Sequence, residues 1–289
     1  MLSPVQTPVE TEHSSHEIDV VDKISPTDFL HKYIHKNRPL LMRQMMSEWG
    51  ARQRWSLEFF HQMASDQQVL LEEGNVMQGE TGFRSQSFKD FVGQLMQSKA
   101  GDGKTAYLSV FRLFDEFPEL RKDVDFSLLD QHKIKSSTVG WIGPAGTVTG
   151  FHIDWGDNIL AQIAGRKLLH LVAPAESAKM YPSKKFDQGT TISQVDLENY
   201  DAEKFPEFAE ARKHRIVLQP GEMIFIPRGW WHHVRSLDVS ISVSNIGYDL
   251  RGILFDAIPH RLKQKLHNAG LWKCDCTCHV VRDGKWCRK

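Results

Sequence analysis

Residues 220–237 read PGEMIFIPRGWWHHVRSL, and this stretch decides the class of fold. A Pro-Gly pair precedes an apolar run, a second Pro and Gly close that run, and another short run follows. Short apolar or alternating runs bounded by Gly and Pro are typical of β-strands joined by tight turns. We therefore expect two strands here, with His232 and His233 near the start of the second.

The same pattern extends in both directions, from Ser136 to Tyr248. Gly or Pro stands at nearly every break, and only residues 175–212 interrupt the pattern, with an irregular and partly helical composition. Many short strands at this spacing predict a barrel or sandwich. The fold class is therefore α+β and mostly β. The other strand-like runs are TVGWIG, NILAQIAG, RKLLHLVAP, HRIVLQPG and VSISVSNI.

The flanking regions have a different composition, which divides the chain into four. Residues 1–20 are rich in Ser, Thr, Pro and Glu and are expected to be disordered. Residues 21–135 read as helices and a strand that pack on the β core of residues 136–249. Within them Ser25 and Pro26 form a helix start signal, an N-cap followed by proline at the first helical position. Residues 250–289 hold helices and a Cys-rich tail.

The charge of the chain excludes some classes of partner. Its 36 basic and 36 acidic residues cancel, which argues against bulk electrostatic capture of nucleic acid or anionic membrane. No apolar run approaches the ~18 residues that a membrane span needs, and the start lacks the basic and apolar regions of a signal peptide. We expect a cytoplasmic protein, with the nucleus as the alternative. All four cysteines follow residue 273, so the β core has no disulfide framework.

A metal site is indicated by GFHIDWGDN at residues 150–158. In a strand, residues two apart point to the same face, so His152 and Asp154 can present an imidazole and a carboxylate to one point. The strand with His232 and His233 can add a second imidazole. Two histidines and one carboxylate form the facial triad of non-haem Fe(II) oxygenases. Zinc accepts the same ligands, so the three residues alone leave a zinc hydrolase open.

Several separated stretches of the chain match, in order, those of the JmjC or cupin-like Fe(II)/2-oxoglutarate oxygenases. The chain resembles in particular small hydroxylases of the JmjC-domain-5 type and factor inhibiting hypoxia-inducible factor. The resemblance covers residues 37–248. It implies a double-stranded β-helix core and the use of Fe(II), 2-oxoglutarate and O₂. The matching stretches are RPLLMRQ, WSLEFF, YLSVFRLFDEFPEL, WIGPAGTVTGFHID, NILAQIAGRKLLHLVAP, SQVDLENYDAEKFPEF, PGEMIFIPRGWWHHVRSLD and SISVS.

The resemblance also assigns the metal ligands as His152, Asp154 and His232. Adjacent strand residues face opposite sides, so only one of the two neighbouring histidines can reach the metal. The family places this ligand directly after an aromatic residue, here Trp231. His233 is then expected to point outward or to make a structural hydrogen bond.

The resemblance implies that Lys167 pairs with the distal carboxylate of 2-oxoglutarate. A dicarboxylate inside an apolar barrel needs a buried cation at its far end, because an unpaired buried carboxylate is very unfavourable. Lys167 would share a strand face with Leu169 and Leu171, which favours an inward lysine, whereas taken alone it reads as a solvated turn residue beside Arg166.

Other positions match family residues around the cosubstrate. Tyr107, Thr149 and Asn158 match residues that contact 2-oxoglutarate, and their hydroxyl and amide groups can hydrogen-bond a carboxylate without adding charge. Trp141 matches an aromatic residue of the pocket wall. After SVS the relatives usually continue with Phe-Trp or Asn-Phe, whereas this chain has Asn245-Ile246-Gly247. We therefore expect Ser244 and Asn245 to line the pocket.

The resemblance to small protein hydroxylases implies an oxygenase that hydroxylates a protein side chain. Hydroxylation of a modified tRNA base is the alternative, since similar enzymes act on tRNA with the same core. Lysine demethylation ranks lower, because no chromatin-reader module is recognisable in the remaining length. From a different class, the chain could be a catalytically inactive cupin-like binding module, although the intact triad and Lys167 argue against it.

The C-terminal region predicts two further features. Ile253, Leu254, Ile258, Leu262 and Leu266 lie at helical spacing, with Pro259 suited to open a second helix and Gly270 to end it. These apolar faces predict a homodimer, as in relatives that dimerise through C-terminal helices. The alternative is that the helices pack back onto the N-terminal helices.

The second feature is a dense cluster of thiols and one imidazole in KCDCTCHVVRDGKWCRK. Such ligands suit a structural zinc that could fold a short tail. The C-x-C-x-C-H spacing is tighter than usual, and three alternatives stay open: a disordered tail with free thiols, a redox-sensitive thiol cluster, and disulfides in an oxidising compartment. The zinc ligands would come from Cys274, Cys276, Cys278, His279 and Cys287.

Overall fold

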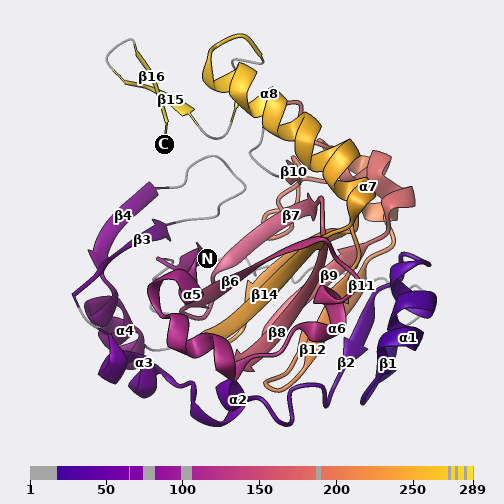
Figure 1. The fold of residues 1–289 in the computed structure, drawn as a ribbon. Helices are drawn as coiled ribbons and strands as arrows, with labels where there is room; N and C mark the ends of the chain where they lie inside the picture. Colours follow the sequence, from indigo (N-terminus) through magenta and orange to yellow (C-terminus); the bar gives the residue numbers. More distant parts are fainter. Residues whose placement is uncertain are drawn as a thin grey trace, which may run out of the picture.

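Two β-sheets form the centre of the computed structural model, which describes residues 18–64, 66–73, 82–98, 106–186, 190–272, 275–276, 279–282 and 285–288. The larger sheet has the strand order β1-β2-β12-β8-β14-β6-β5 and the smaller one β10-β7-β13-β9-β11 (Figure 1). In the larger sheet the strands are β1 (Asp19–Val21), β2 (Leu40–Met42), β5 (Leu108–Phe111), β6 (Lys135–Gly143), β8 (Asp157–Ala164), β12 (Met223–Ile226) and β14 (Ser240–Tyr248). In the smaller sheet they are β7 (Val148–Asp154), β9 (Lys167–Val172), β10 (Thr190–Ile192), β11 (His214–Leu218) and β13 (Trp231–Ser236).

The two sheets alternate along the chain, as in a double-stranded β-helix. Consecutive strands β6 to β9 pass from the larger sheet to the smaller, back and across again. The residues 220–237 that predicted two strands form β12 and β13, and the Pro/Gly bend between them carries the chain from one sheet to the other. The predicted mostly-β cupin fold is confirmed.

The N-terminal region packs on the outer face of the larger sheet and also extends it. Phe29, Phe60 and Phe88 are fully buried in one cluster with Phe225 and Val243 of the sheet. Strand β2 pairs with β12, so the region is part of the core sheet as well as its cover. Its other elements are α1 (Pro26–Phe29), a π-helical turn (Leu30–Ile34), α2 (Gly50–Arg54), α3 (Leu57–Met63), β3 (Gln68–Glu73), β4 (Gly82–Ser87), α4 (Phe88–Gln97), α5 (Leu113–Glu116), a 3₁₀ helix (Pro118–Asp123) and α6 (Ser127–Asp130).

The first helix begins where the sequence predicts. The Ser25 hydroxyl accepts a hydrogen bond from the Asp28 backbone N–H at 3.1 Å, and Pro26 is the first helical residue. This bond satisfies one of the N–H groups that a helix start leaves without a partner.

The insert at residues 175–212 covers the outer face of the smaller sheet. It holds 3₁₀ helices at Pro174–Met180 and Pro206–Glu210 as well as β10. Phe205 and Phe208 from the insert pack with Phe151 of β7 and Trp231 of β13 in one buried cluster. The partly helical character predicted for the insert is confirmed, and its role is to bury the second face of β7 and β13.

The C-terminal region is one uninterrupted helical segment rather than two helices. It runs through α7 (Leu250–Gly252), a π-helical turn (Ile253–Ala257) and α8 (Ile258–Asn268), with Pro259 in the first turn of α8 as predicted (Figure 1). The His260 ring contacts Trp155 edge-on at 4.5 Å between centroids. A hairpin of β15 (His279–Arg282) and β16 (Lys285–Arg288) follows. Among the described helices, none is long and apolar enough to cross a membrane.

Candidate metal centre

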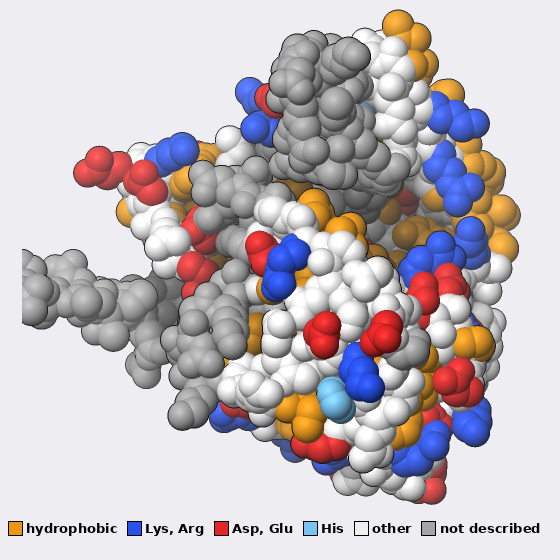
Figure 2. All heavy atoms as spheres, turned by 90° about the vertical axis from the view of Figure 1, so that its left-hand side faces the viewer, with side chains coloured by type: hydrophobic (Ala, Val, Ile, Leu, Met, Phe, Trp, Pro, Cys, Tyr) orange, Lys and Arg blue, Asp and Glu red, His pale blue; other side chains and the backbone are white. Residues whose placement is uncertain are grey.

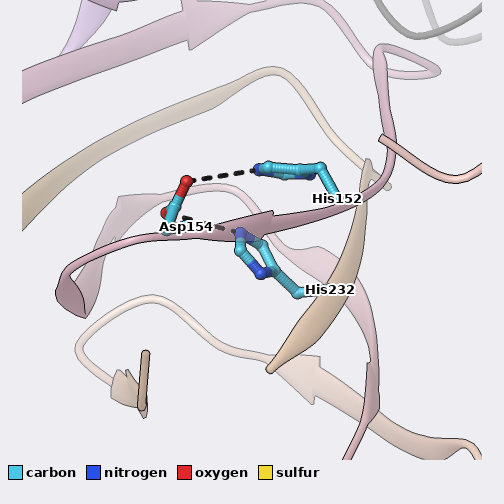
Figure 3. A group of neighbouring side chains, drawn as sticks. All are labelled: His152, Asp154 and His232. Carbon is cyan, nitrogen blue, oxygen red and sulfur yellow. Dashed lines mark ion pairs between the residues drawn. The ribbon is translucent and has the colours of Figure 1, made fainter. Parts of the chain in front are cut away.

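Three side chains converge between the sheets from two neighbouring strands (Figure 3). His152 and Asp154 come from β7 and His232 from β13, where the register places His232 directly opposite His152. The His152 Nε2 lies 3.9 Å from Asp154 Oδ1, and the His232 Nε2 lies 3.6 Å from Asp154 Oδ2. All ligand atoms of the three lie within 4.8 Å of one another. This arrangement can hold one metal ion.

The backbone orients both imidazoles for binding a cation. The Nδ1 of His152 lies 2.9 Å from the Gly150 carbonyl, and the Nδ1 of His232 lies 3.1 Å from the Trp230 carbonyl. A carbonyl only accepts hydrogen bonds, so each Nδ1 carries the proton and each Nε2 presents its lone pair toward Asp154. Burial, and secondarily the neighbouring His152, lowers the pKa of His232 to about 4. Neutral imidazole is the form that binds metal.

His233 lies on the opposite face of β13, as the strand alternation predicts. It therefore points away from the metal, as expected, and the insert covers that outer face, which leaves His233 1% exposed. Its ring contacts Phe151 at 5.4 Å between centroids, and its Nε2 lies 3.5 Å from Glu198 Oε1. No hydrogen bond of the described residues reaches either ring nitrogen, and burial lowers the pKa of His233 to about 3.

A cavity of about 330 Å³ extends from the triad between the two sheets, and Lys167 lies in its wall. Lys167 begins β9, after a turn in which Gly165 has a φ of +69°, a conformation that favours glycine. Its side chain shares the inner face with Leu169 and Leu171, as predicted, and the residue is 3% exposed. The space-filling view shows the surface hollowed beside hydrophobic and basic side chains (Figure 2).

Burial determines the charge of Lys167. No ion pair of Lys167 occurs within the described part of the chain, and burial lowers its pKa to about 7. An amine held in this way is poised to gain a proton when an anion enters, because the ion pair restores the favourable charged form.

The residues predicted around the cosubstrate lie together in the same wall. The Tyr107 and Thr149 hydroxyls are 3.1 Å apart, and the Asn158 Nδ2 donates to Asp154 Oδ2 at 3.2 Å. The Asn158 Oδ1 is buried without a hydrogen-bond partner among the described residues. The Trp141 Nε1 donates to the Ser244 hydroxyl at 3.0 Å, so both line the cavity.

Asn245 is the exception, and its predicted place in the cavity wall is wrong. Its Nδ2 donates to Asp130 Oδ1 at 2.7 Å, and its Oδ1 accepts from the Thr138 hydroxyl at 2.9 Å. Adjacent residues of β14 face opposite sides, so the inward position of Ser244 turns Asn245 away from the cavity.

Glu72 is a cavity residue that sequence reasoning did not find. It lies on β3, is 5% exposed and accepts a hydrogen bond from the Ser109 hydroxyl at 2.5 Å. Burial raises its pKa. Alternation along β3 places Glu72 on the same face as the exposed Leu70, so the local pattern predicts that Glu72 is exposed to solvent. Its burial comes from backbone pairing between Glu72 and Tyr107, at 2.8 and 2.9 Å.

The Cys-rich tail lies mostly outside the described residues. Cys274 and Cys278 are among the residues left out, and the side chains of His279 and Cys287 are not described. Cys276 is half-buried, and its neighbour Asp275 accepts a backbone hydrogen bond from Phe186 at 3.0 Å. The zinc site therefore stays a prediction.

Comparison with known proteins agrees with the fold and the triad. Residues 26–248 match the family described as a cupin-like domain, and proteins named for the JmjC domain are among the similar sequences. The chain belongs to the JmjC-type cupin family of Fe(II)/2-oxoglutarate oxygenases. The match covers the smaller sheet, all strands of the larger sheet except β1, and the three triad residues.

Three relatives illustrate the degree of similarity. Lysine-specific demethylase 8 of Xenopus tropicalis is 34% identical over 223 residues, 75% of this chain and 49% of that protein. Lysine-specific demethylase JMJ30 of Arabidopsis thaliana is 34% identical, over 76% of this chain and 52% of that protein. Jumonji C domain-containing protein 5 of Drosophila melanogaster is 30% identical, over 83% of this chain and 62% of that protein. The chain thus spans about half the length of the first two relatives.

The residues of this JmjC domain fit the metal and cosubstrate of the family. Two neutral imidazoles and a carboxylate suit Fe(II) and leave coordination positions open. The buried amine of Lys167 and the Asn158 Oδ1, which has no hydrogen-bond partner among the described residues, show that the cavity has polar groups placed for a ligand.

Proposed function

We propose that this protein is an Fe(II)- and 2-oxoglutarate-dependent oxygenase that hydroxylates a protein side chain. The observation that carries the proposal is the joint placement of the triad and a buried lysine in one cavity. His152, Asp154 and His232 would hold the iron. When bound, the iron supplies oxidative decarboxylation of 2-oxoglutarate and oxidation of a C–H bond, with O₂ as the oxidant.

The surrounding residues would bind and orient the cosubstrate. Lys167 would pair with one carboxylate of 2-oxoglutarate as a buried ammonium, and the hydroxyls of Tyr107 and Thr149 would donate hydrogen bonds to carboxylate oxygens. Asn158 would keep the Asp154 carboxylate in place through its amide N–H. The apolar part of the wall, which includes Leu160 and Ile226, would exclude water from the reacting atoms.

A protein substrate is favoured over tRNA by the charge of the cavity wall. Besides the triad, Lys167 and Tyr107, the wall contains the buried carboxyl group of Glu72. A carboxylate at the end of β3 suits a cationic or hydrogen-bond-donating side chain and repels phosphate. The relatives named as lysine-specific demethylases agree with a protein substrate, and demethylation starts with hydroxylation of a methyl group. A binding module without catalysis would not need the intact triad.

The test is an activity assay of the full chain with Fe(II), 2-oxoglutarate and O₂, in the presence of cell-extract peptides or tRNA. We expect succinate formation and peptides that gain one oxygen atom by mass spectrometry. Loss of a methyl group with release of formaldehyde would instead identify a demethylase. Modification confined to tRNA would refute the protein substrate. The Asp154→Ala variant is the control for each reaction.

Binding of 2-oxoglutarate is expected to weaken as the pH rises above 7. The ligand-free Lys167 is charged below its pKa of about 7 and neutral above it. Ion pairing with the ligand favours the charged form, so binding above pH 7 takes up a proton, and affinity should fall by about tenfold per pH unit. Calorimetry in buffers of different ionisation enthalpy measures this uptake. A Lys167→Met variant should show no such proton uptake, and the same pH slope in both proteins would contradict the role of Lys167.

We also propose a homodimer through the C-terminal helical segment. Leu250, Leu254, Ile258 and Leu262 lie four residues apart and are all exposed, so they form one apolar stripe. Light scattering should report a dimer at micromolar concentration. The double variant Leu254→Glu with Leu262→Glu should lower the affinity of dimerisation by about tenfold or more, because the dimer would then bury two carboxylates in each protomer. Leu70→Glu, at an exposed leucine of β3, is the matched control, and a wild-type monomer would refute the dimer.

A further inference from the structure

A groove of about 750 Å³ leads outward from the metal centre. It shares Asp154 with the inner cavity, so both spaces border this residue of the triad. Trp155 and Tyr248 line it near Asp154, whose charge raises the pKa of Tyr248 in addition to the larger effect of burial. A substrate whose reacting group reaches the metal would pass through this groove.

One wall of the groove is a stripe of the C-terminal helical segment. Arg251, Phe255, Pro259 and Lys263 all line the groove and follow one another at intervals of four residues. Residues four apart lie on the same helix face. The stripe therefore has a cation at each end and two apolar side chains between them. Phe255 is 72% exposed, and both cations are exposed.

The cations of this stripe have no acidic partner in the described part of the chain, whereas the acids of the groove are engaged. Asp157 pairs with Lys133 and accepts the Arg228 backbone N–H at 2.8 Å. Arg228 in turn pairs with Asp256 at 2.8 Å. A third acid, Asp249, caps α7 by accepting the Gly252 N–H at 2.6 Å.

The excess of positive charge is a local property. Helix α8 carries Arg261, Lys263 and Lys265 and has no acidic residue, in a chain whose net charge is zero. Such a patch beside a groove attracts anionic groups and raises their local concentration. The stripe that faces the groove and the apolar stripe of Leu254, Ile258 and Leu262 lie on adjacent faces of the same segment, because their positions are offset by one residue, about 100° around the helix.

We propose that this groove binds an acidic segment of the protein substrate, with Arg251 and Lys263 pairing with two acidic side chains and Phe255 contacting an apolar residue between them. This inference rests on the proposed function. The 12 positions from Arg251 to Lys263 correspond to about 18 Å at a helical rise of ~1.5 Å per residue. An extended peptide rises about 3.3 Å per residue, so the two acidic residues should lie five or six positions apart.

A peptide fits this groove better than RNA. Affinity for a phosphate backbone grows with the number of phosphates that Lys and Arg neutralise, and the stripe offers only two cations. Asp157, Asp249 and Asp256 line the same groove and would repel a chain of phosphates. Separate acidic side chains can meet the two cations and avoid the acids.

The experiment is selection from a random peptide library displayed on phage, with the full chain of residues 1–289 immobilised. Four proteins are compared: the wild type, the double variant Arg251→Gln with Lys263→Gln, the charge-reversed double variant Arg251→Glu with Lys263→Glu, and Lys265→Gln as a matched control on α8. We expect wild-type selection to enrich Asp or Glu at two positions five or six apart around an apolar residue. Enrichment should fall about tenfold in the double variant and persist in the control. Arg251→Glu with Lys263→Glu should enrich Lys or Arg instead.

Selection without acidic enrichment, or with the same enrichment in the double variant, would overturn the proposal. The proposal would also be overturned if total tRNA displaced the selected phage more strongly than an acidic peptide does, and if this displacement were lost in the double variant. The groove would then bind RNA. The proposed function is tested by a different assay, and it would be refuted if the protein showed no iron-dependent turnover of 2-oxoglutarate. The two failures are therefore distinguishable. Thermal unfolding of each variant verifies that the fold is retained.

Discussion

Replacing Asp154 with alanine is expected to abolish iron-dependent turnover of 2-oxoglutarate, with a loss of at least about a thousandfold. The variant removes the carboxylate that lies 3.9 Å and 3.6 Å from the two histidine Nε2 atoms and leaves only two ligands. Because a bound metal contributes several kcal/mol to catalysis, its loss corresponds to a factor of about a thousand. Turnover is measured as succinate formation, and iron content is measured on the same samples.

The neighbouring histidines provide the sharpest control for this prediction. His232→Ala should behave like Asp154→Ala, whereas His233→Ala should keep iron and turnover, since His233 lies behind the strand under the insert. His233→Ala also leaves a buried space, so we expect it to lower the unfolding temperature. An inactive, folded and iron-free His233 variant beside an active His232 variant would show that the wrong face of β13 had been assigned.

Replacing Lys167 with alanine or methionine is expected to weaken 2-oxoglutarate binding by about a hundredfold to a thousandfold while iron stays bound. The reason is that removing one partner of a buried ion pair costs about 3–5 kcal/mol, and each 1.4 kcal/mol is a factor of ten. Affinity is measured by calorimetry with the metal-loaded protein, and metal content by elemental analysis. Arg166→Ala is the matched control, because Arg166 is adjacent and exposed and pairs with Asp238 outside the cavity.

The stability of the Lys167→Met variant separates a binding role from a structural one. In the ligand-free protein, burial makes the ammonium unfavourable, as its lowered pKa shows. Methionine removes that buried amine, so the variant should unfold at the same or a higher temperature than the wild type without ligand. Added 2-oxoglutarate should then stabilise the wild type and not the variant. A destabilised Lys167→Met protein with normal affinity would show that the lysine is structural.

Local sequence patterns determined much of the fold and the strand face of several site residues, whereas the roles of His232 and Lys167 were implied by the family resemblance. Pro and Gly at the ends of β12 and β13 marked these strands, because these residues favour turns wherever they stand. Alternation within a strand placed His152 and Asp154 on one face, and Lys167 on the face of Leu169. These are properties of residues one to four positions apart, and a single sequence contains them in full.

The tertiary structure alone decided what covers each face. His233 faces away from the metal as alternation requires, yet it is buried because the insert at residues 175–212 folds over β13. Glu72 reaches the cavity because β3 pairs with Tyr107, and Asn245 leaves it for Asp130. The stripe from Arg251 to Lys263 borders the groove because the helical segment lies across the open end of the sheets (Figure 1). Alternation tells which side chains share a face, but whether that face meets solvent, a cavity or another segment depends on contacts between residues far apart in the chain.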